Sequence, residues 1–293
     1  MNLRGALMCT TAMFLVGSSV PLSRELLDYP TLAGQAARYA LAAAVLLVLA
    51  RGFPRLTTRD AVRLVALAAT GLAGFNICLL AALREADPAT VGTVIGATPV
   101  VLALAGRRST RLVLGAVVMV IGAALVQGVG HASLAGLLWS VGALGGEVAF
   151  SLVAAPLVPR LGPIAVSAYA CVFAVPLLAA ASLAAGEQWR MPVPAEAGVL
   201  LYLAVVLTAG AFVIWYAGLK RLGVAKAGMF AGLFPVAALA GAAVLDGAVP
   251  SPVAIAGTVL VGAGLVFGLA EPRRRAVAGT RQQPGASPSP LPS

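Results

Sequence analysis

The sequence contains very few charged residues for its length. Asp, Glu, Lys and Arg make up only 10% of the 293 residues, while hydrophobic residues make up 60% and the mean hydropathy is +0.99. A soluble globular domain carries about 25% charged residues, so this composition excludes an ordinary soluble fold. The shortage of charge indicates a chain that lies largely in a lipid bilayer.

Residue types that bind metals or catalyse reactions are also scarce. The chain has one histidine, His131, and three cysteines without CxxC or metal-ligand spacing. It contains no P-loop, no GxGxxG after a strand and no HExxH motif. The net charge of +10 belongs to no basic soluble domain that could bind nucleic acid. We therefore expect no metal, no cofactor, no nucleic-acid partner and no ATP-driven pump.

Long uncharged runs account for most of the chain. A helix needs roughly 20 apolar residues to cross the hydrocarbon core of a bilayer. Runs of this kind predict ten helices, at residues 5–21, 31–50, 62–83, 88–106, 112–130, 132–153, 164–185, 198–219, 227–245 and 251–270. A turn at Gly128–His131 separates the fifth helix from the sixth. The predicted fold class is an all-α integral membrane protein with ten transmembrane helices.

The basic residues indicate how the chain crosses the membrane. With the N-terminus in the cytoplasm, 16 of the 20 Lys and Arg residues fall on the cytoplasmic side, and only Arg24, Arg84 and Arg190 fall on the other. Cytoplasmic loops are enriched in Lys and Arg, so both termini are predicted to be cytoplasmic. The preference for Arg over Lys in an Ala- and Gly-rich chain is typical of a GC-rich bacterium. We therefore expect a multi-pass protein of the bacterial plasma (inner) membrane.

Two segments that lie 136 residues apart repeat one pattern. Residues 83–100 and 219–236 align without a gap and share the pairs Leu83/Leu219, Ala89/Ala225, Gly92/Gly228, Gly96/Gly232, Pro99/Pro235 and Val100/Val236. Acidic residues, Glu85 and Asp87, precede the first copy, whereas Lys220 and Arg221 precede the second. This difference predicts that the two copies enter the bilayer from opposite sides.

The repeat divides the chain into two halves of five helices each. Residues 115–122 and 257–264 form a second matching pair, at an offset of 142. Because five is an odd number, the second half must be inverted relative to the first. We predict two inverted five-helix repeats at residues 1–130 and 131–270, followed by a disordered cytoplasmic tail at residues 271–293, which is rich in Pro and Ser.

The pattern of helices four and nine, with a glycine opening helices one and six, resembles the EamA-type members of the drug/metabolite transporter superfamily. The resemblance covers roughly residues 5–270 and implies ten helices around a central cavity that opens alternately to each side. The chain departs from the family after helix four, where Gly106-Arg107-Arg108 replaces the frequent Gly-Glu-Arg, and after helix nine, where Leu245-Asp246-Gly247 stands.

The resemblance implies a secondary transporter. We expect export of a small metabolite, an amino-acid-like compound or a drug, with protons as a coupling ion. An uptake permease stays open as an alternative, as does a membrane-integral enzyme or lipid-processing protein. The expected partners are the small-molecule substrate and the lipid bilayer, and the sequence leaves both a monomer and a homodimer open.

Glu147 is the residue most strongly indicated as functional. It lies within predicted helix six, where a charge at the bilayer centre costs about 2.5–3.5 kcal/mol on insertion scales. Ser133, Ser140 and Glu147 are spaced by seven residues, and Ser151 follows four residues later, so they predict one polar helix face. We interpret Glu147 as a cavity residue that binds substrate or a proton, or else as a structural carboxylate bonded to a neighbouring helix.

Other polar residues within the predicted helices are further candidates for the cavity. Arg38 either extends toward the membrane surface or faces inward and balances Glu147 or an anionic substrate group. Asn76 is expected to bond across helices or to line the cavity. Tyr202 and Thr208 could reach the cavity from helix eight. Trp215 and Tyr216, which precede Lys220-Arg221, are interpreted as an interfacial aromatic belt.

Glycines and prolines mark the centres of helices four and nine. Glycines four residues apart let another helix approach closely, and a proline three residues later kinks the helix. The candidates for hinges or packing sites are Gly92, Gly96, Pro99, Gly228, Gly232 and Pro235.

Overall fold

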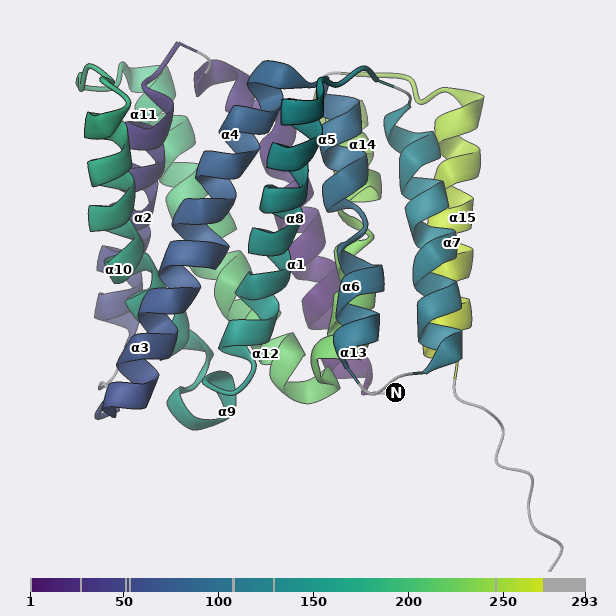
Figure 1. The fold of residues 1–293 in the computed structure, drawn as a ribbon, viewed down its shortest axis with the longest axis horizontal. Coiled ribbons are helices and arrows are strands. Elements are labelled where there is room, and N and C mark those ends of the chain that lie inside the picture. Colours follow the sequence, from purple (N-terminus) through teal and green to yellow (C-terminus); the bar gives the residue numbers. More distant parts are fainter. Residues whose placement is uncertain are drawn as a thin grey trace, which may run out of the picture.

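The computed structural model describes residues 2–26, 28–50, 52, 54–106, 109–128, 130–245 and 247–270 as a single helical bundle (Figure 1). Within these ranges the regular structure is helical, apart from one isolated bridge between Ala86 and Ala132. The predicted tail at residues 271–293 lies outside the described residues, as do Arg107, Arg108 and Asp246 of the family departures.

The helices follow the chain order that the sequence predicts. They are α1 (Leu3–Leu22), η1 (Ser23–Leu26), α2 (Thr31–Leu49), α3 (Thr58–Leu67), η2 (Ala68–Gly74), α4 (Phe75–Glu85), α5 (Pro88–Ile95), α6 (Thr98–Ala105), α7 (Thr110–Gln127), α8 (Leu134–Ala154), α9 (Val158–Leu161), α10 (Pro163–Ala184), α11 (Pro194–Tyr202), η3 (Leu203–Gly210), α12 (Ala211–Leu222), α13 (Val224–Ala231), α14 (Phe234–Leu245) and α15 (Pro252–Leu269). Where the structure is described, nine helical segments are long and apolar enough to cross a membrane. The helix α1 is not among the nine, so its crossing stays a prediction.

The third and eighth membrane segments are longer than predicted. They cover Thr58–Glu85 and Pro194–Leu222, and each begins four residues before its predicted start. Asp60 and Glu196 explain the early starts, because each carboxylate accepts a hydrogen bond from a backbone N–H three residues earlier, at 2.9 Å and 2.8 Å. Such caps satisfy the free N–H groups of a first helical turn. Both segments also contain a π-helical stretch, η2 and η3, which the sequence did not predict.

The fourth and ninth membrane segments are broken at the predicted prolines. The helix α5 ends before Gly96, and α6 begins at Thr98 with Pro99 at its second position. The helix α13 likewise ends before Gly232, and α14 begins one residue before Pro235. Proline is compatible with the first turn of a helix but not with its interior. The predicted kinks at both prolines are therefore confirmed.

Helices from the two halves of the chain pack against each other in pairs. The pairs are α2 with α10, α6 with α13, and α7 with α15, and the last pair lies side by side in Figure 1. A Cβ atom placed on Gly115 of α7 would lie 2.6 Å from the carbonyl oxygen of Gly264 of α15. The backbones of α7 and α15 are therefore in direct contact, as small residues permit in membrane helices.

Candidate functional site

Aromatic and polar side chains from four helices meet in the interior of the bundle. They are Tyr39 of α2, Asn76 of α4, Phe150 of α8, and Phe212 and Tyr216 of α12, which we call the central cluster. The Phe150 ring centroid lies 4.7 Å from that of Phe212 and 4.9 Å from that of Tyr216, and Tyr39 lies 6.4 Å from Phe212. Offset aromatic pairs at these distances stabilise a packed interior.

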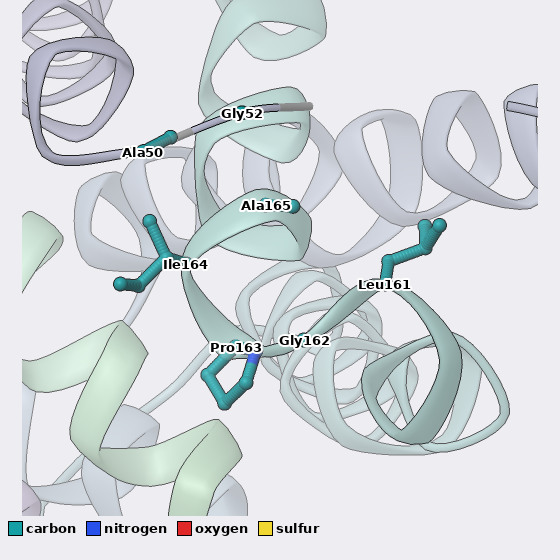
Figure 2. Close-up of a pocket in the computed structure, with 7 residues that line it drawn as sticks. All are labelled: Ala50, Gly52, Leu161, Gly162, Pro163, Ile164 and Ala165. Atoms are coloured by element: carbon teal, nitrogen blue, oxygen red, sulfur yellow. The ribbon is translucent and has the colours of Figure 1, made fainter. Parts of the chain in front are cut away.

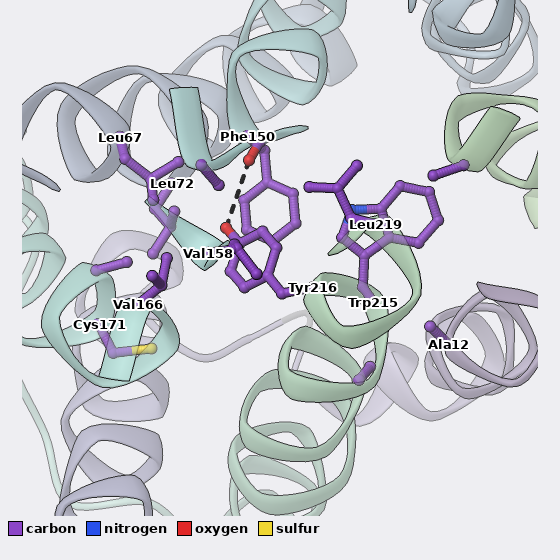
Figure 3. Packing of buried hydrophobic residues seen from close by; sticks show 14 of the residues in the cluster. Ala12, Leu67, Leu72, Phe150, Val158, Val166, Cys171, Trp215, Tyr216 and Leu219 are labelled. Atoms are coloured by element: carbon purple, nitrogen blue, oxygen red, sulfur yellow. Dashed lines mark hydrogen bonds between the residues drawn. The ribbon is translucent and has the colours of Figure 1, made fainter. Parts of the chain in front are cut away.

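Trp215 and Tyr216 belong to this interior, so their interpretation as an interfacial belt is wrong (Figure 3). The exposed fraction of the side chain is 3% for Trp215 and 0% for Tyr216. The indole N–H of Trp215 donates to the Ser151 hydroxyl at 3.3 Å, and the Tyr216 hydroxyl donates to the Phe150 carbonyl at 3.4 Å. The helix α12 continues to Leu222, beyond the predicted end at residue 219, and Phe150 and Ser151 of α8 contact its aromatic residues.

Glu147 lies on the buried face of α8 and yet is itself only partly buried. Its neighbours on that face, Ser140, Ala143, Ser151 and Ala154, are at most 1% exposed. Among the residues that the structure describes, none forms a hydrogen bond or an ion pair with Glu147. Glu147 is therefore a partly accessible carboxylate on an otherwise buried helix face.

Arg38 and Asn76 are joined through a residue that the sequence did not indicate. The Tyr39 hydroxyl accepts hydrogen bonds from Arg38 Nη2 at 3.0 Å and from Asn76 Nδ2 at 3.2 Å. The Arg38 guanidinium lies over the Tyr39 ring, 4.7 Å from its centroid. Arg38 forms no ion pair with Glu147, since none of the described ion pairs includes either residue. Asn76 bonds across helices, as expected for a mid-membrane amide.

The remaining polar candidates do not join the central cluster. The Ser140 hydroxyl donates to the Gly136 carbonyl at 2.7 Å, and the Thr208 hydroxyl donates to the Leu203 carbonyl at 2.9 Å. The Tyr202 hydroxyl lies 2.8 Å from the hydroxyl of Ser18 on α1. Each of these groups therefore already has a partner near its own position.

Gly228, Gly232 and Pro99 lie where the broken helices meet, whereas Gly92 and Gly96 lie beside α7. Cβ atoms placed on Gly228 and Gly232 would lie 2.6 Å from Leu102 Cβ and 3.1 Å from Pro99 Cγ. The Gly96 N–H donates to the Gly92 carbonyl at 2.8 Å, which closes the last turn of α5. Gly92 itself lies against the side chain of Gln127. These positions require small residues for packing, and their role as hinges stays a prediction.

Two pockets lie at opposite ends of the bundle, and neither is lined by a predicted cavity residue. The first, of about 240 Å³, is apolar and lies beside the start of α10; its lining residues are Ala50, Gly52, Leu161, Gly162, Pro163, Ile164 and Ala165 (Figure 2). The second, of about 360 Å³, is lined by Asp28, Tyr29, Pro30, Thr31, Glu187, Gln188 and Arg190. Its polar groups connect α2 to the loop before α11.

The contacts at this second pocket, which we call the upper latch, centre on Glu187 and Arg190. The Glu187 carboxylate accepts hydrogen bonds from the N–H groups of Leu32 and Ala33 at 3.0 Å and 2.9 Å, and from the Ser182 hydroxyl at 2.7 Å. Arg190 donates to Glu196 at 2.7 Å and to the Asp28 carbonyl at 3.2 Å. A carboxylate at a helix N-terminus also interacts favourably with the helix dipole.

The upper latch depends on the charge of Glu187. Partial burial opposes ionisation, but the hydrogen bonds from Leu32, Ser182 and Ala33 outweigh it and lower the pKa of Glu187 below its usual value of 4.5. A lowered pKa in the folded state contributes stability above about pH 4.5, and this stability is lost as the pH falls through the lowered pKa. The latch is therefore expected to hold at neutral pH and to weaken only in acid.

Replacing Glu187 with Gln should loosen the N-terminus of α2. The amide has no negative charge and one acceptor fewer, so amide hydrogen exchange at Leu32 and Ala33 should accelerate by roughly tenfold or more at neutral pH. Exchange measured by mass spectrometry on the full-length protein tests this. The exposed Glu25→Gln serves as control, and equal protection of both variants would contradict the role of Glu187.

Comparison with known proteins supports the architecture and the class of protein. Residues 127–269 match the model of the EamA-like transporter family. A protein of Bacillus subtilis (strain 168) described as "Uncharacterized transporter YetK" is 27% identical over 249 residues, which cover 78% of this chain and 75% of that protein. One solved crystal structure of a protein shares the fold, with a TM-score of 0.80 and 23% identity over 92% of this chain and 97% of that chain.

Proposed function

Because the chain is an EamA-type transporter of the drug/metabolite transporter superfamily, we propose that it exports a small metabolite, an amino-acid-like compound or a drug by alternating access. The observation that carries this proposal is Glu147, a partly buried carboxylate within an apolar helix that has no hydrogen-bond or ion-pair partner among the described residues. Ionisable residues in membrane interiors are expensive and usually functional. In a membrane transporter, such a residue can bind substrate or a proton.

We further propose that residues 1–130 and 131–270 form two inverted repeats, with ten membrane crossings in total. Structural features that recur about 136 residues apart support it. Asp60 and Glu196 cap the third helix of each half, the π-helical stretches η2 and η3 follow each cap, and the breaks at Pro99 and Pro235 come next. The helices α3 and α11 start at opposite ends of the bundle (Figure 1), as an inverted arrangement requires.

We place the lower end of the bundle, which holds the N-terminus in Figure 1, in the cytoplasm. Most described basic residues belong to helix ends and loops on that side, namely Arg4, Arg55, Arg59, Arg63, Arg111, Arg160, Lys220, Arg221 and Lys226. Arg84 and Arg190 lie toward the opposite end. The positive-inside tendency then puts both termini in the cytoplasm of a bacterial cell, and the upper latch on the outer face.

Transport by this arrangement requires the two halves to move against each other. The upper latch joins α2 of the first half to Glu187 and Arg190 of the second half, so opening toward the outside must break it. The broken helices α5–α6 and α13–α14 meet at mid-bundle and give each half a place to bend. Glu147 would bind a proton in one state and release it in the other, which couples export to the proton gradient.

Chemical labelling of the residues that precede the two repeated segments is a direct test of this topology. Single cysteines at residues 85 and 221, in a background that lacks Cys9, Cys78 and Cys171, should react with an impermeant maleimide from opposite sides of the membrane. The residue 85 site should be labelled in intact cells, and the residue 221 site only after permeabilisation. Labelling of both sites from one side would end the inverted-repeat proposal.

One metabolic screen can identify both the cargo and the direction of its transport. Metabolite and toxicant profiles of a deletion strain and an overexpressing strain are compared, and the cargo is the compound that accumulates in one and is depleted in the other. Export predicts accumulation inside the deletion strain. Accumulation inside the overexpressing strain would instead establish uptake.

A further inference from the structure

Arg38 is a partly buried cation that has no counter-charge among the described residues. On α2 it shares a helix face with Gln35 and Ala42, at spacings of three and four residues, and Ala42 is fully buried. The side of α2 that faces lipid is marked instead by Leu41 and Val48, which are 42% and 85% exposed. Arg38 lies at the border between these two sides, three residues from Leu41 and four from Ala42, and its Nε atom is buried.

Part of the hydrogen-bonding capacity of this face is unused within the described residues. The Tyr39 hydroxyl is the one acceptor that Arg38 contacts within the described part of the chain. The Nε atom of Arg38 and the Oε1 atom of Gln35, one turn away, are both buried without a partner. Buried polar groups normally find partners, and a guanidinium inside a membrane requires an anion or a water-filled space.

The geometry of the guanidinium suits a carboxylate. Tyr39 holds Nη2 from one side and supports the plane of the group with its ring, at 4.7 Å. Asn76 fixes the Tyr39 hydroxyl in turn. A guanidinium fork that is held in this way binds a carboxylate through two parallel hydrogen bonds. Lysine, with a point charge on a flexible stem, would not reproduce this arrangement.

The apolar central cluster adjoins Arg38 through Tyr39. Tyr39 contacts Phe212, which contacts Phe150 and Tyr216 in the central cluster. Aromatic rings of this kind bind the apolar part of a ligand while a few polar groups fix its orientation. The two neighbouring features select for a molecule with an anionic group at one end and an apolar body at the other.

We propose that Arg38 is the specificity-determining residue of the transporter and that the cargo is an amphipathic monocarboxylate. Its carboxylate binds the free edge of the Arg38 guanidinium, and its apolar body packs against the central cluster. This inference rests on the proposed transport function and narrows the class of cargo. Glu147, which lies on α8, belongs to the separate proton site. When it is ionised, its negative charge repels the carboxylate of the cargo.

Thermal unfolding of the purified full-length protein in detergent tests the assignment with four matched probes. The probes are phenylacetate, its uncharged amide phenylacetamide, the cation phenethylamine, and acetate, which lacks the ring. Phenylacetate should raise the unfolding temperature at concentrations at least tenfold lower than any other probe requires. Stabilisation by phenylacetamide at the same concentration, or no stabilisation by phenylacetate, would overturn the proposal.

Variants of Arg38 distinguish the effect of the guanidinium geometry from the effect of the positive charge. Arg38→Gln should abolish the effect of phenylacetate, and Arg38→Lys should weaken binding at least tenfold because lysine lacks the fork. Tyr39→Phe should weaken it less, and the exposed Arg59→Gln should bind as the unchanged protein does. A monodisperse elution profile shows that each variant is folded. If Arg38→Gln does not fold, Arg38→Lys still tests the role of the guanidinium. Undiminished binding by Arg38→Lys would contradict the role of the fork.

Failure of this inference can be told apart from failure of the transport function. A cargo that is found by metabolite profiling, is transported in proteoliposomes and carries no anionic group would leave the transporter intact and overturn the assignment of Arg38. Binding of phenylacetate that depends on Arg38, together with no flux of any cargo in proteoliposomes, would instead overturn the transport function alone.

Discussion

Replacing Glu147 with Gln is expected to abolish flux driven by a pH gradient. The amide has nearly the same shape as the carboxylic acid but cannot bind and release a proton, so the gradient can no longer be coupled to the cargo. Uptake of labelled cargo into proteoliposomes with an imposed pH gradient should fall at least tenfold. Exchange of cargo across the same membranes without a gradient should persist, because glutamine has nearly the size and shape of glutamic acid.

The Glu147→Gln variant should also fold at least as well as the unchanged protein. Glu147 has no hydrogen-bond or ion-pair partner among the described residues, so the substitution removes an uncompensated charge and breaks no contact. Its unfolding temperature should be equal or higher. The matched control is Glu25→Gln at an exposed position outside the bundle core. Gradient-driven flux that survives in Glu147→Gln would remove Glu147 from the mechanism.

Replacing Gly264 with Val is expected to separate α7 from α15 and to destabilise the protein. A Cβ atom at this position would lie 2.7 Å from both the Gly115 carbonyl oxygen and Met119 Cγ. The backbone oxygen cannot move aside without moving its helix. Overpacking of this kind costs about 1–3 kcal/mol or more. The unfolding temperature and the yield of monodisperse protein should both fall.

A second glycine on the same helix supplies the control. Gly262 lies two residues before Gly264, and a Cβ atom placed on it meets nothing within 4 Å. Gly262→Val adds the same side chain to the same helix, so its effect should stay within about 0.5 kcal/mol. Equal loss of stability in the two variants would show that the contact between α7 and α15 is not responsible.

Most of the architecture could be predicted from local composition. Each apolar run long enough to span a bilayer became a helix, and Pro99 and Pro235 broke their helices because proline lacks a backbone N–H. The turn at Gly128–His131 also separates α7 from α8 as predicted. The early starts of the third and eighth segments were missed because Asp60 and Glu196 cap helices, whereas hydropathy counts them only as charges.

The candidate site was predicted less completely. Glu147, Arg38 and Asn76 stood out because polar groups are rare in apolar runs; the structure buries Asn76 and leaves Glu147 and Arg38 partly buried. Tyr39, Phe150 and Phe212 gave no signal, since isolated aromatic residues are ordinary in membrane helices. Trp215 and Tyr216 were assigned to the interface because Lys220 and Arg221 follow them, but a helix carries neighbouring residues on different faces.

The sequence by itself determined which segments prefer lipid, where proline interrupts them and on which loops the positive charges lie. These properties depend on the transfer of each segment from water to the bilayer and on local backbone chemistry. Only the tertiary structure decided that Arg38 meets Tyr39, that Glu187 closes the N-terminus of α2, and that Trp215 lies inside. The rotation of a helix about its own axis is set by side-chain packing against its neighbours, and hydropathy does not record it.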